Sequence, residues 1–171
     1  MPFKYPFLVS KVYGENNIQI LVDIIKKDVP IIYGLDASIL LIADSGSLYN
    51  MTGATNSEGI KYTHYSIHYS INSGLTGKSI SKKQILFIEN PIIEPKFDSH
   101  IDNIYEISNI RNIVLIPLFD QLSEPIGVIQ LLNNMYGFDE FFKVQLKRKA
   151  LKSFNQLWKK QSNLVKHSTI F

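Results

Sequence analysis

The chain has 171 residues, of which 45% are hydrophobic, and a formal net charge of +3. This length predicts a single domain with a sizeable core, and so weak a positive charge gives little reason to expect a nucleic-acid partner. The absence of cysteine excludes disulfides, thiolate metal sites and cysteine nucleophiles. We find no signal-peptide pattern and no apolar run of membrane-spanning length, and we therefore expect a cytoplasmic protein without a membrane span.

The first half of the chain predicts one helix followed by three strands. Apolar residues at helical spacing indicate a helix over about 13–29, ended by Pro30. The segment 38–43 reads as a buried strand, and a turn then leads to a returning strand over 48–51, which makes a hairpin. Alternation of Tyr, Thr and Ile predicts a third strand over 61–71.

The second half predicts an antiparallel hairpin between helices. The expected elements are a short helix starting near Gly74 and Gly77, a strand over 85–90, a helix over about 99–107, strands over 112–119 and 125–132, and a closing helix from about Asp139 to Val165. Asp139 is also expected to cap the closing helix through its side chain. Together these elements predict the α+β class, with an antiparallel sheet and helices packed against it in one domain over 1–171.

Two patterns that suggest chemistry are better explained by structure alone. His64 and His68 are four residues apart, which would suit a metal site on a helix. On a strand this spacing is roughly 13 Å, too far for both to bind one ion. The basic stretch "KRKALK" (147–152) places charge on more than one side of a helix, so we interpret it as a solvated face rather than a nucleic-acid site.

The stretch "SGLTGKS" (73–79) is the strongest local signal for a ligand. Glycines at a helix start leave backbone N–H groups free to face an anion, and the helix dipole favours negative charge there. A tight turn that needs a positive φ explains the same glycines without any ligand. The stretch alone does not decide between these two interpretations.

Three motifs in sequence order resemble GAF domains, most closely those of cyclic-nucleotide phosphodiesterases. They are "GLTGKSISKKQILFIENPIIEPKF", "IRNIVLIPLFD" and "PIGVIQLLNN". The resemblance covers most of the chain, with a core of about 13–166. It implies a sheet of about six antiparallel strands, with the terminal helices on one face and a ligand pocket on the other, covered by short helices and loops.

The resemblance also implies a set of ligand-binding positions. The Ser of the first strand, which meets the purine in the family, corresponds to Ser38. The helix start that meets the cyclic phosphate corresponds to Gly74, Leu75, Thr76 and Gly77. The acidic residue of the covering helix corresponds to Asp102, the residue that opens the next strand to Arg111, and the amide of the last strand to Gln130. Two positions depart from the family. The base-reading Asp is replaced by Gly53 or Ala54, and Asn134 stands where the family signature has Lys. We therefore expect weak selectivity between cyclic GMP and cyclic AMP.

Two functional hypotheses follow from the resemblance. The first is a non-catalytic regulatory or sensor domain that binds a small molecule, with cyclic GMP and cyclic AMP as candidates and no other cofactor. The second is a ligand-free module that forms a homodimer through its first and last helices or docks on a partner protein. Filling of the pocket by isoleucines would favour it, and "NPIIEP" supplies large apolar residues at the lid. Enzymes of this superfamily that reduce methionine sulfoxide use cysteine nucleophiles, which this chain lacks, so we expect no catalysis.

Overall fold

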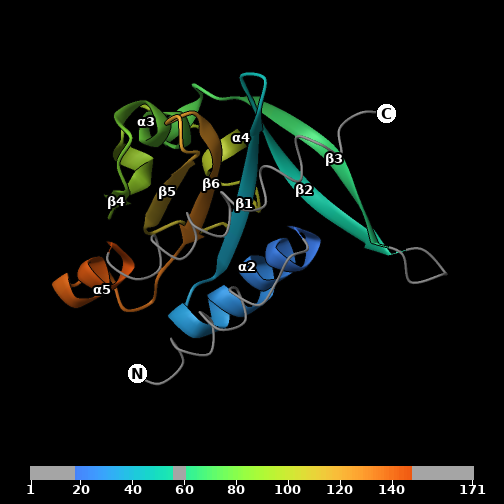
Figure 1. Ribbon diagram of the computed structural model, residues 1–171. Helices are drawn as coiled ribbons and strands as arrows, with labels where there is room; N and C mark the ends of the chain where they lie inside the picture. Colours follow the sequence, from blue (N-terminus) through green and yellow to red (C-terminus); the bar gives the residue numbers. More distant parts are fainter. Residues whose placement is uncertain (1–17, 56–60, 148–171) are drawn as a thin grey trace.

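The computed structural model describes residues 18–55 and 61–147. Within these residues the chain forms one six-stranded sheet with helices packed on both faces (Figure 1). In chain order the elements are helix α2 (Ile18–Tyr33), strands β1 (Ala37–Asp44), β2 (Ser47–Thr55) and β3 (Lys61–Ser70), helix α3 (Gly74–Lys82), strand β4 (Leu86–Ile88), 3-10 helix η1 (Pro91–Ile93), helix α4 (Ser99–Asp102), strands β5 (Ile113–Phe119) and β6 (Pro125–Leu132), and helix α5 (Glu140–Gln145).

The sheet is antiparallel throughout, in the order β3-β2-β1-β6-β5-β4. Strands β1 and β6 form its centre, with Ile39 opposite Gln130 and Leu41 opposite Val128. Only residues 47–50 of β2 pair with β1, whereas β2 pairs with β3 along its whole length. The two strands therefore extend beyond the rest of the sheet as a ribbon (Figure 1).

Alternation along β1 separates the two faces of the sheet. Leu40 is buried in one cluster with Ile25 of α2, whereas Leu41 is buried in the other with Leu75 of α3 and Ile101 of α4. Successive strand residues point to opposite faces, so each face receives its own apolar layer. Fully burying a side chain of this size stabilises the fold by about 1.5–3 kcal/mol.

The described parts of the first and last helices lie on the same face. Phe138, just before α5, and Leu146, just after it, belong to the buried cluster that contains Ile25 and Val29 of α2. Helices α3 and α4 cover the opposite face (Figure 1). The predicted α+β architecture is confirmed: the sheet has six antiparallel strands, the described parts of the first and last helices lie on one face, and the short helices cover the other. The expected segments 13–17 and 148–165 lie outside the described residues.

The prediction that Pro30 ends the first helix is wrong, because α2 continues to Tyr33 with Pro30 inside it. A proline inside a helix removes one hydrogen bond and costs about 3 kcal/mol. Val29 and Tyr33 are both buried and four residues apart, so their burial against the sheet offsets this cost. The helix instead ends at Gly34, whose φ of +64° is the left-handed conformation typical of a helix C-terminus.

The helix predicted over 99–107 is also wrong in length, since α4 covers only Ser99–Asp102. The Asn103 side chain ends it by bonding the backbone of Ile107 twice. Its Oδ1 accepts from Ile107 N at 2.9 Å, and its Nδ2 donates to Ile107 O at 3.0 Å. Asn side chains compete with helical hydrogen bonds in this way.

Candidate functional site

The start of α3 is capped by a side chain from another helix. The backbone N–H groups of Leu75 and Thr76 donate to Asp102 of α4, at 2.8 Å to Oδ2 and 2.9 Å to Oδ1. Ser73, at the N-cap position itself, makes no side-chain capping bond. The first N–H groups of a helix have no partner within the helix. A residue 26 positions further along the chain therefore satisfies two of them.

Asp102 is fully buried and accepts two more hydrogen bonds. The Thr76 hydroxyl donates to Oδ1 at 2.7 Å, and the Asp98 N–H donates to Oδ2 at 2.9 Å. Burial disfavours the charged form and raises the pKa of Asp102 above its usual value, although the hydrogen bonds from Asp98, Thr76 and Leu75 oppose this effect. Among the described residues, Asp102 is the only buried residue with an ionisable carboxyl or basic group.

Gln130 extends this arrangement from the centre of the sheet. Its Nε2 donates to Thr76 Oγ1 at 2.8 Å and to the Ile101 carbonyl at 2.8 Å. Because the Thr76 hydroxyl already donates to Asp102, it accepts from the Gln130 amide, which fixes the orientation of that amide. Gln130 Oε1 is buried and has no hydrogen-bond partner among the described residues. We refer to Thr76, Asp102 and Gln130 as the polar cluster.

The two glycines predicted at the helix start are required by close packing. Gly74 has a φ of +65°, and a Cβ at this position would lie 2.6 Å from Asp102 Oδ2. A Cβ at Gly77 would lie 2.4 Å from the backbone carbon of Asn72, a distance that real Cβ atoms do not reach. Both glycines are therefore explained by the way that α3 packs against the chain, without reference to a ligand.

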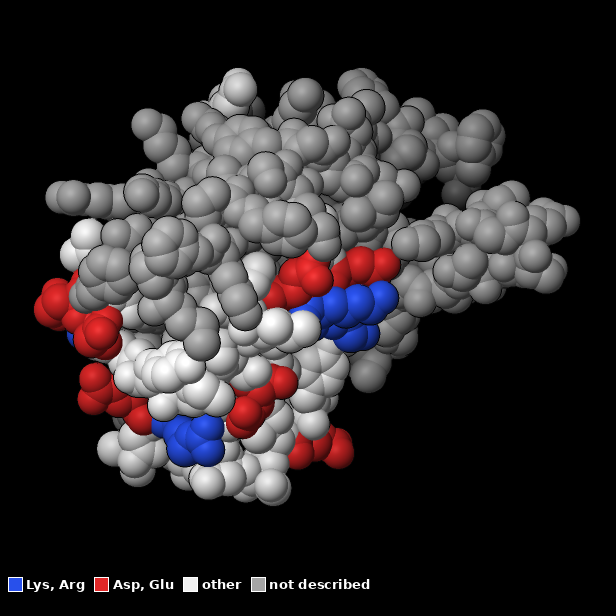
Figure 2. All heavy atoms as spheres, turned by 90° about the horizontal axis from the view of Figure 1, so that it is seen from below, with Lys and Arg blue, Asp and Glu red and all other residues white. Residues whose placement is uncertain are grey.

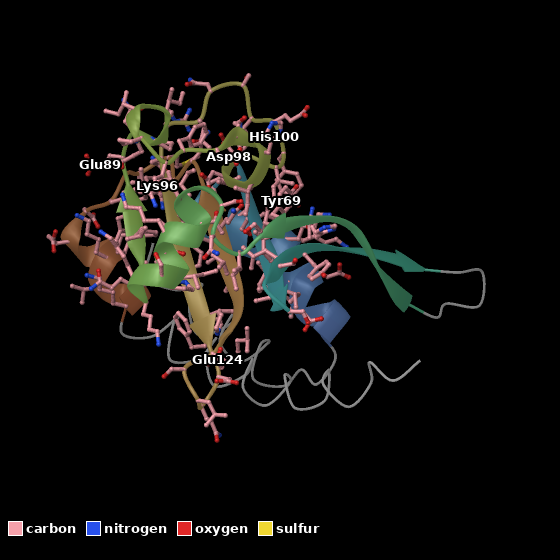
Figure 3. The ribbon with its side chains drawn as sticks, turned by 90° about the horizontal axis from the view of Figure 1, so that it is seen from above. Tyr69, Glu89, Lys96, Asp98, His100 and Glu124 are labelled. Atoms are coloured by element: carbon pink, nitrogen blue, oxygen red, sulfur yellow. The ribbon has the colours of Figure 1, made fainter. Side chains whose placement is uncertain are left out.

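The surroundings of the polar cluster are apolar. Leu75 and Ile101 flank it, and both belong to the buried cluster on this face of the sheet. The Lys78 ammonium lies in the second turn of α3 and pairs with Glu94 at 3.5 Å. Figure 3 shows this face with α3 and α4 above the sheet and Asp98 labelled at the start of α4. No buried cation among the described residues lies beside the Asp102 carboxyl group to favour its charged form.

The structure brings together most of the residues predicted to bind a ligand, but not all. Gly74, Leu75, Thr76, Gly77, Asp102 and Gln130 lie at or beside the polar cluster. Ser38 does not, because its hydroxyl donates to the Ile25 carbonyl of α2 on the opposite face of the sheet. Arg111 is exposed, and its guanidinium pairs with Asp36 at 3.8 Å. The predicted site therefore divides into one cluster and two separate positions.

The two isoleucines of "NPIIEP", expected at the lid of the pocket, lie at the surface and fill no buried space. Ile92 and Ile93 are 61% and 75% exposed, because the turn of η1 directs them to the surface while Pro91 is buried. On β3, the strand predicted for His64 and His68 is present. Within the part of the chain that the structure describes, no group of three His, Cys, Asp or Glu residues could hold a metal ion, and no helix is long and apolar enough to cross a membrane.

A second buried polar group, at the end of β6, was not identified as such from the sequence. Asn133 Oδ1 accepts from the N–H groups of Arg111 and Asn112 at 2.6 and 3.3 Å. Its Nδ2 donates to Asp36 Oδ2 at 2.7 Å and to the Asn109 carbonyl at 2.8 Å. Every polar atom of this amide is paired, and its role is therefore to hold the strand ends together. In the sequence, the adjacent pair Asn133 and Asn134 was the signal that could have indicated this buried group.

Asn134, which stands where the family signature has Lys, also connects the end of β6 to the segment that precedes β5. Its N–H donates to Asn112 Oδ1 at 2.7 Å, and its carbonyl accepts from Asn112 Nδ2 at 3.1 Å. Its Oδ1 accepts from Tyr136 N at 2.8 Å. Hydrogen bonds of the Asn112 side-chain amide thus connect β6 to the segment that precedes β5, at the position where the family signature has Lys.

No family model matches the sequence, and no curated protein sequence matches it. Among solved structures, the chain is similar to the GAF domain of an Acinetobacter phosphoenolpyruvate-protein phosphotransferase, with a TM-score of 0.71, 15% identity, and coverage of 98% of this chain and 96% of that chain. It is also similar to the GAF domain of such a phosphotransferase from Coxiella burnetii, with a TM-score of 0.67, 17% identity, and coverage of 92% and 94%.

A third similar structure is an enzyme, the free methionine-R-sulfoxide reductase of Neisseria meningitidis in complex with its substrate. The TM-score is 0.69 and the identity 13%, with coverage of 94% of this chain and 89% of that chain. At these identities the likeness concerns the fold alone, and the closer resemblance to phosphodiesterase domains stays a prediction. The strand order, the placement of the helices and these likenesses together show that the chain has the GAF fold.

Proposed function

We propose that this chain is a regulatory domain that senses a small molecule on the α3–α4 face of the sheet. The observation that carries the proposal is the unpaired Oε1 of Gln130, which is buried beside two satisfied neighbours, Thr76 and Asp102. A buried acceptor without a partner costs about 1–3 kcal/mol. A ligand that places an N–H or O–H donor against this oxygen would recover that free energy.

The same arrangement makes a cyclic phosphate a poor ligand of the domain as described. A phosphate at the start of α3 would need the N–H groups of Leu75 and Thr76, which already donate to Asp102. The carboxylate would also repel a second negative charge in these apolar surroundings. In addition, Gly53 and Ala54 have no side chain that can hydrogen-bond a purine edge. We expect cyclic GMP and cyclic AMP to bind weakly and to differ by less than about tenfold, or 1.4 kcal/mol.

Thermal unfolding and calorimetric titration with four probes test this proposal. The probes are cyclic GMP, cyclic AMP, guanosine and adenosine, which separate the phosphate from the base. We expect the neutral nucleosides to stabilise the domain at least as much as the cyclic nucleotides, since they do not compete with Asp102. Gln130→Leu should abolish the stabilisation, because it removes the unpaired acceptor. Nanomolar binding that is strongly selective for cyclic GMP would refute the proposal.

A second candidate is a ligand-free module that binds a partner protein. It is favoured by the exposure of Ile92 and Ile93 in η1, which places two large apolar residues side by side on the surface. Asp102 also completes the capping of α3 without an external group. If none of the four probes stabilises the wild-type domain, this candidate replaces the first.

A further inference from the structure

We propose that η1 is a surface through which the chain binds a second copy of itself. Ile92 and Ile93 of one copy pack against the same residues of the other, and Glu89 of each copy pairs with Lys96 of the other. The inference rests on the surface named under the second candidate function, a module that binds a protein, and it assigns the partner. It does not depend on ligand binding at the polar cluster.

Two neighbouring isoleucines form the apolar centre of this surface. Ile92 and Ile93 are 61% and 75% exposed, whereas Pro91 before them is buried. Single exposed apolar side chains are common on protein surfaces, but apolar side chains that lie together mark a contact with another molecule. Burial of the pair against a partner removes apolar area from water, which is the main favourable contribution to protein association.

The segment that carries the isoleucines is fixed in one conformation before any partner binds. The Glu94 N–H donates to the Pro91 carbonyl at 3.0 Å, and the Phe97 N–H donates to the Glu94 carbonyl at 2.9 Å. The Lys78 ammonium pairs with the Glu94 carboxylate at 3.5 Å, which connects the end of η1 to α3. Pro91 and Pro95 restrict the backbone at two positions. A preorganised surface loses little conformational freedom on binding, so even a small contact gives measurable association.

The charges beside the isoleucines favour a second copy as the partner. Glu89 comes three residues before Ile92, and Lys96 comes three residues after Ile93. Both are exposed, and neither forms an ion pair with another residue that the structure describes. Glu89 follows β4 at the edge of the sheet, whereas Lys96 lies just before α4 (Figure 3). Two opposite charges therefore stand at the two ends of one short segment.

A twofold axis through the isoleucine pair makes this surface complementary to itself. Pairs of identical chains usually associate about such an axis, so that the same surface is used twice. The axis exchanges the two ends of the segment, and Glu89 of each copy then meets Lys96 of the other. Two ion pairs flank the apolar centre. Glu94 adds no repulsion, because its charge is already balanced by Lys78 of the same copy.

The size of the contact sets the affinity that we expect. Interfaces that bury less than about 1,200 Å² in total belong to weak or transient complexes, and residues 89–96 form a contact of this class. We therefore expect a reversible dimer with a dissociation constant in roughly the micromolar to millimolar range. Sedimentation equilibrium over a concentration series measures this constant. If the first and last helices also pair, η1 joins those dimers into larger assemblies, and loss of the η1 contact returns the mass to that of the helix-mediated dimer.

Reversal of single charges tests the inference. Glu89→Lys places two positive charges at each end of the contact, and Lys96→Glu places two negative charges there. Each variant should raise the dissociation constant roughly tenfold, since two exposed ion pairs become repulsions. An equimolar mixture of the two variants should associate as the wild type does, because opposite charges meet again. The double variant Glu89→Lys/Lys96→Glu should also recover the association.

Glu124→Lys is a matched control for the change in net charge. Glu124 is exposed in the turn between β5 and β6, away from η1 (Figure 3). Its substitution should leave the dissociation constant unchanged. In Ile92→Ser/Ile93→Ser, the η1 contact should be lost while the unfolding temperature of the monomer stays the same, because both side chains are exposed.

The outcomes separate the inference from both candidate functions. A wild type that shows no η1-dependent association up to millimolar concentration overturns the inference, and another protein then remains the partner under the second candidate function. Equal weakening by Glu124→Lys and Glu89→Lys also overturns it, since association would follow net charge and not η1. The same holds if neither the mixture nor the double variant recovers. Stabilisation by nucleosides is measured separately in Ile92→Ser/Ile93→Ser, so its presence or absence tests only the sensing proposal.

Discussion

Asp102 is the residue in which burial and hydrogen bonding oppose one another most directly. Its carboxylate is fully buried, which raises its pKa from the usual value of 3.8, and the hydrogen bonds that it accepts work against this. The net direction is upward. The folded domain therefore binds a proton at Asp102 more readily than the unfolded chain does.

This direction predicts how stability depends on pH. In the range just above 3.8, the folded state binds more protons than the unfolded state, so the free energy of unfolding falls as pH rises. The contribution of Asp102 is fully present below 3.8 and is lost as pH rises through the folded pKa. We expect the stability of the wild type, minus that of Asp102→Asn, to decrease from pH values just above 3.8 towards neutrality. Urea unfolding over a pH series measures this difference.

The comparison with Asp102→Asn serves as the control, because the other carboxylates titrate alike in both proteins and cancel. A difference that increases with pH would contradict the prediction. It would mean that the donors from Leu75, Thr76 and Asp98 stabilise the charge by more than burial disfavours it.

Individual residues also mark the limit of what the sequence could predict about the site. Thr76, Asp102 and Gln130 were matched to binding positions, and they do meet in space. Nothing in the spacing of Asp102 indicated that its side chain would cap α3, because this bond joins segments 26 residues apart. Ser38 was matched to the family's purine-binding position through the resemblance, but its hydroxyl donates to Ile25 O of α2, on the face of the sheet opposite the polar cluster.

At the scale of the elements, local signals succeeded where a residue acts on its own neighbours. Asp139 was predicted to cap the closing helix, and its Oδ1 accepts from Phe142 N at 2.7 Å. The strands of the sheet were found from alternation and turns. The two wrong helix ends have another origin. At Pro30, burial of Tyr33 outweighed the tendency of proline to end a helix. At Asn103, a side-chain hydrogen bond to Ile107 ended a helix that the sequence pattern predicted to continue.

The cap of α5 provides a prediction for a single element. Asp139→Ala removes the acceptor for Phe142 N and the negative charge near the helix start, and should lower the free energy of unfolding by about 1 kcal/mol. Asp139→Asn keeps the acceptor and should cost only a fraction of this. Guanidinium unfolding of both variants provides the measurement. Equal losses would show that the charge, and not the hydrogen bond, accounts for the effect.

The whole molecule has two faces with different consequences for function. The α3–α4 face carries the polar cluster, whereas α2 and α5 pack on the other face over a buried cluster of apolar side chains. Figure 2 shows the molecule from below, and the described part of this surface carries both acidic and basic side chains. Such a mixed surface gives no reason to expect a polyanionic partner there. An interaction through this side would instead depend on its exposed apolar residues.

Ile31 of α2 and Val144 of α5 are 71% and 39% exposed, and they allow the predicted homodimer to be tested. If the first and last helices form the interface, Ile31→Lys and Val144→Lys should each lower the mass in solution from dimer to monomer. Each should change the free energy of unfolding of the monomer by about 0.5 kcal/mol or less, as is usual for surface positions. Light scattering over a concentration series measures the mass.

Ile93→Lys distinguishes this interface from one on the opposite side of the domain. Ile93 is 75% exposed in η1, next to Ile92. Its substitution by Lys should leave the mass of a helix-mediated dimer unchanged. A monomeric wild-type chain at all concentrations would reject the homodimer altogether. A dimer that only Ile93→Lys dissociates would move the interface to the α3–α4 side. The two copies would then meet near α3, whose Lys78 pairs with Glu94 at the end of η1.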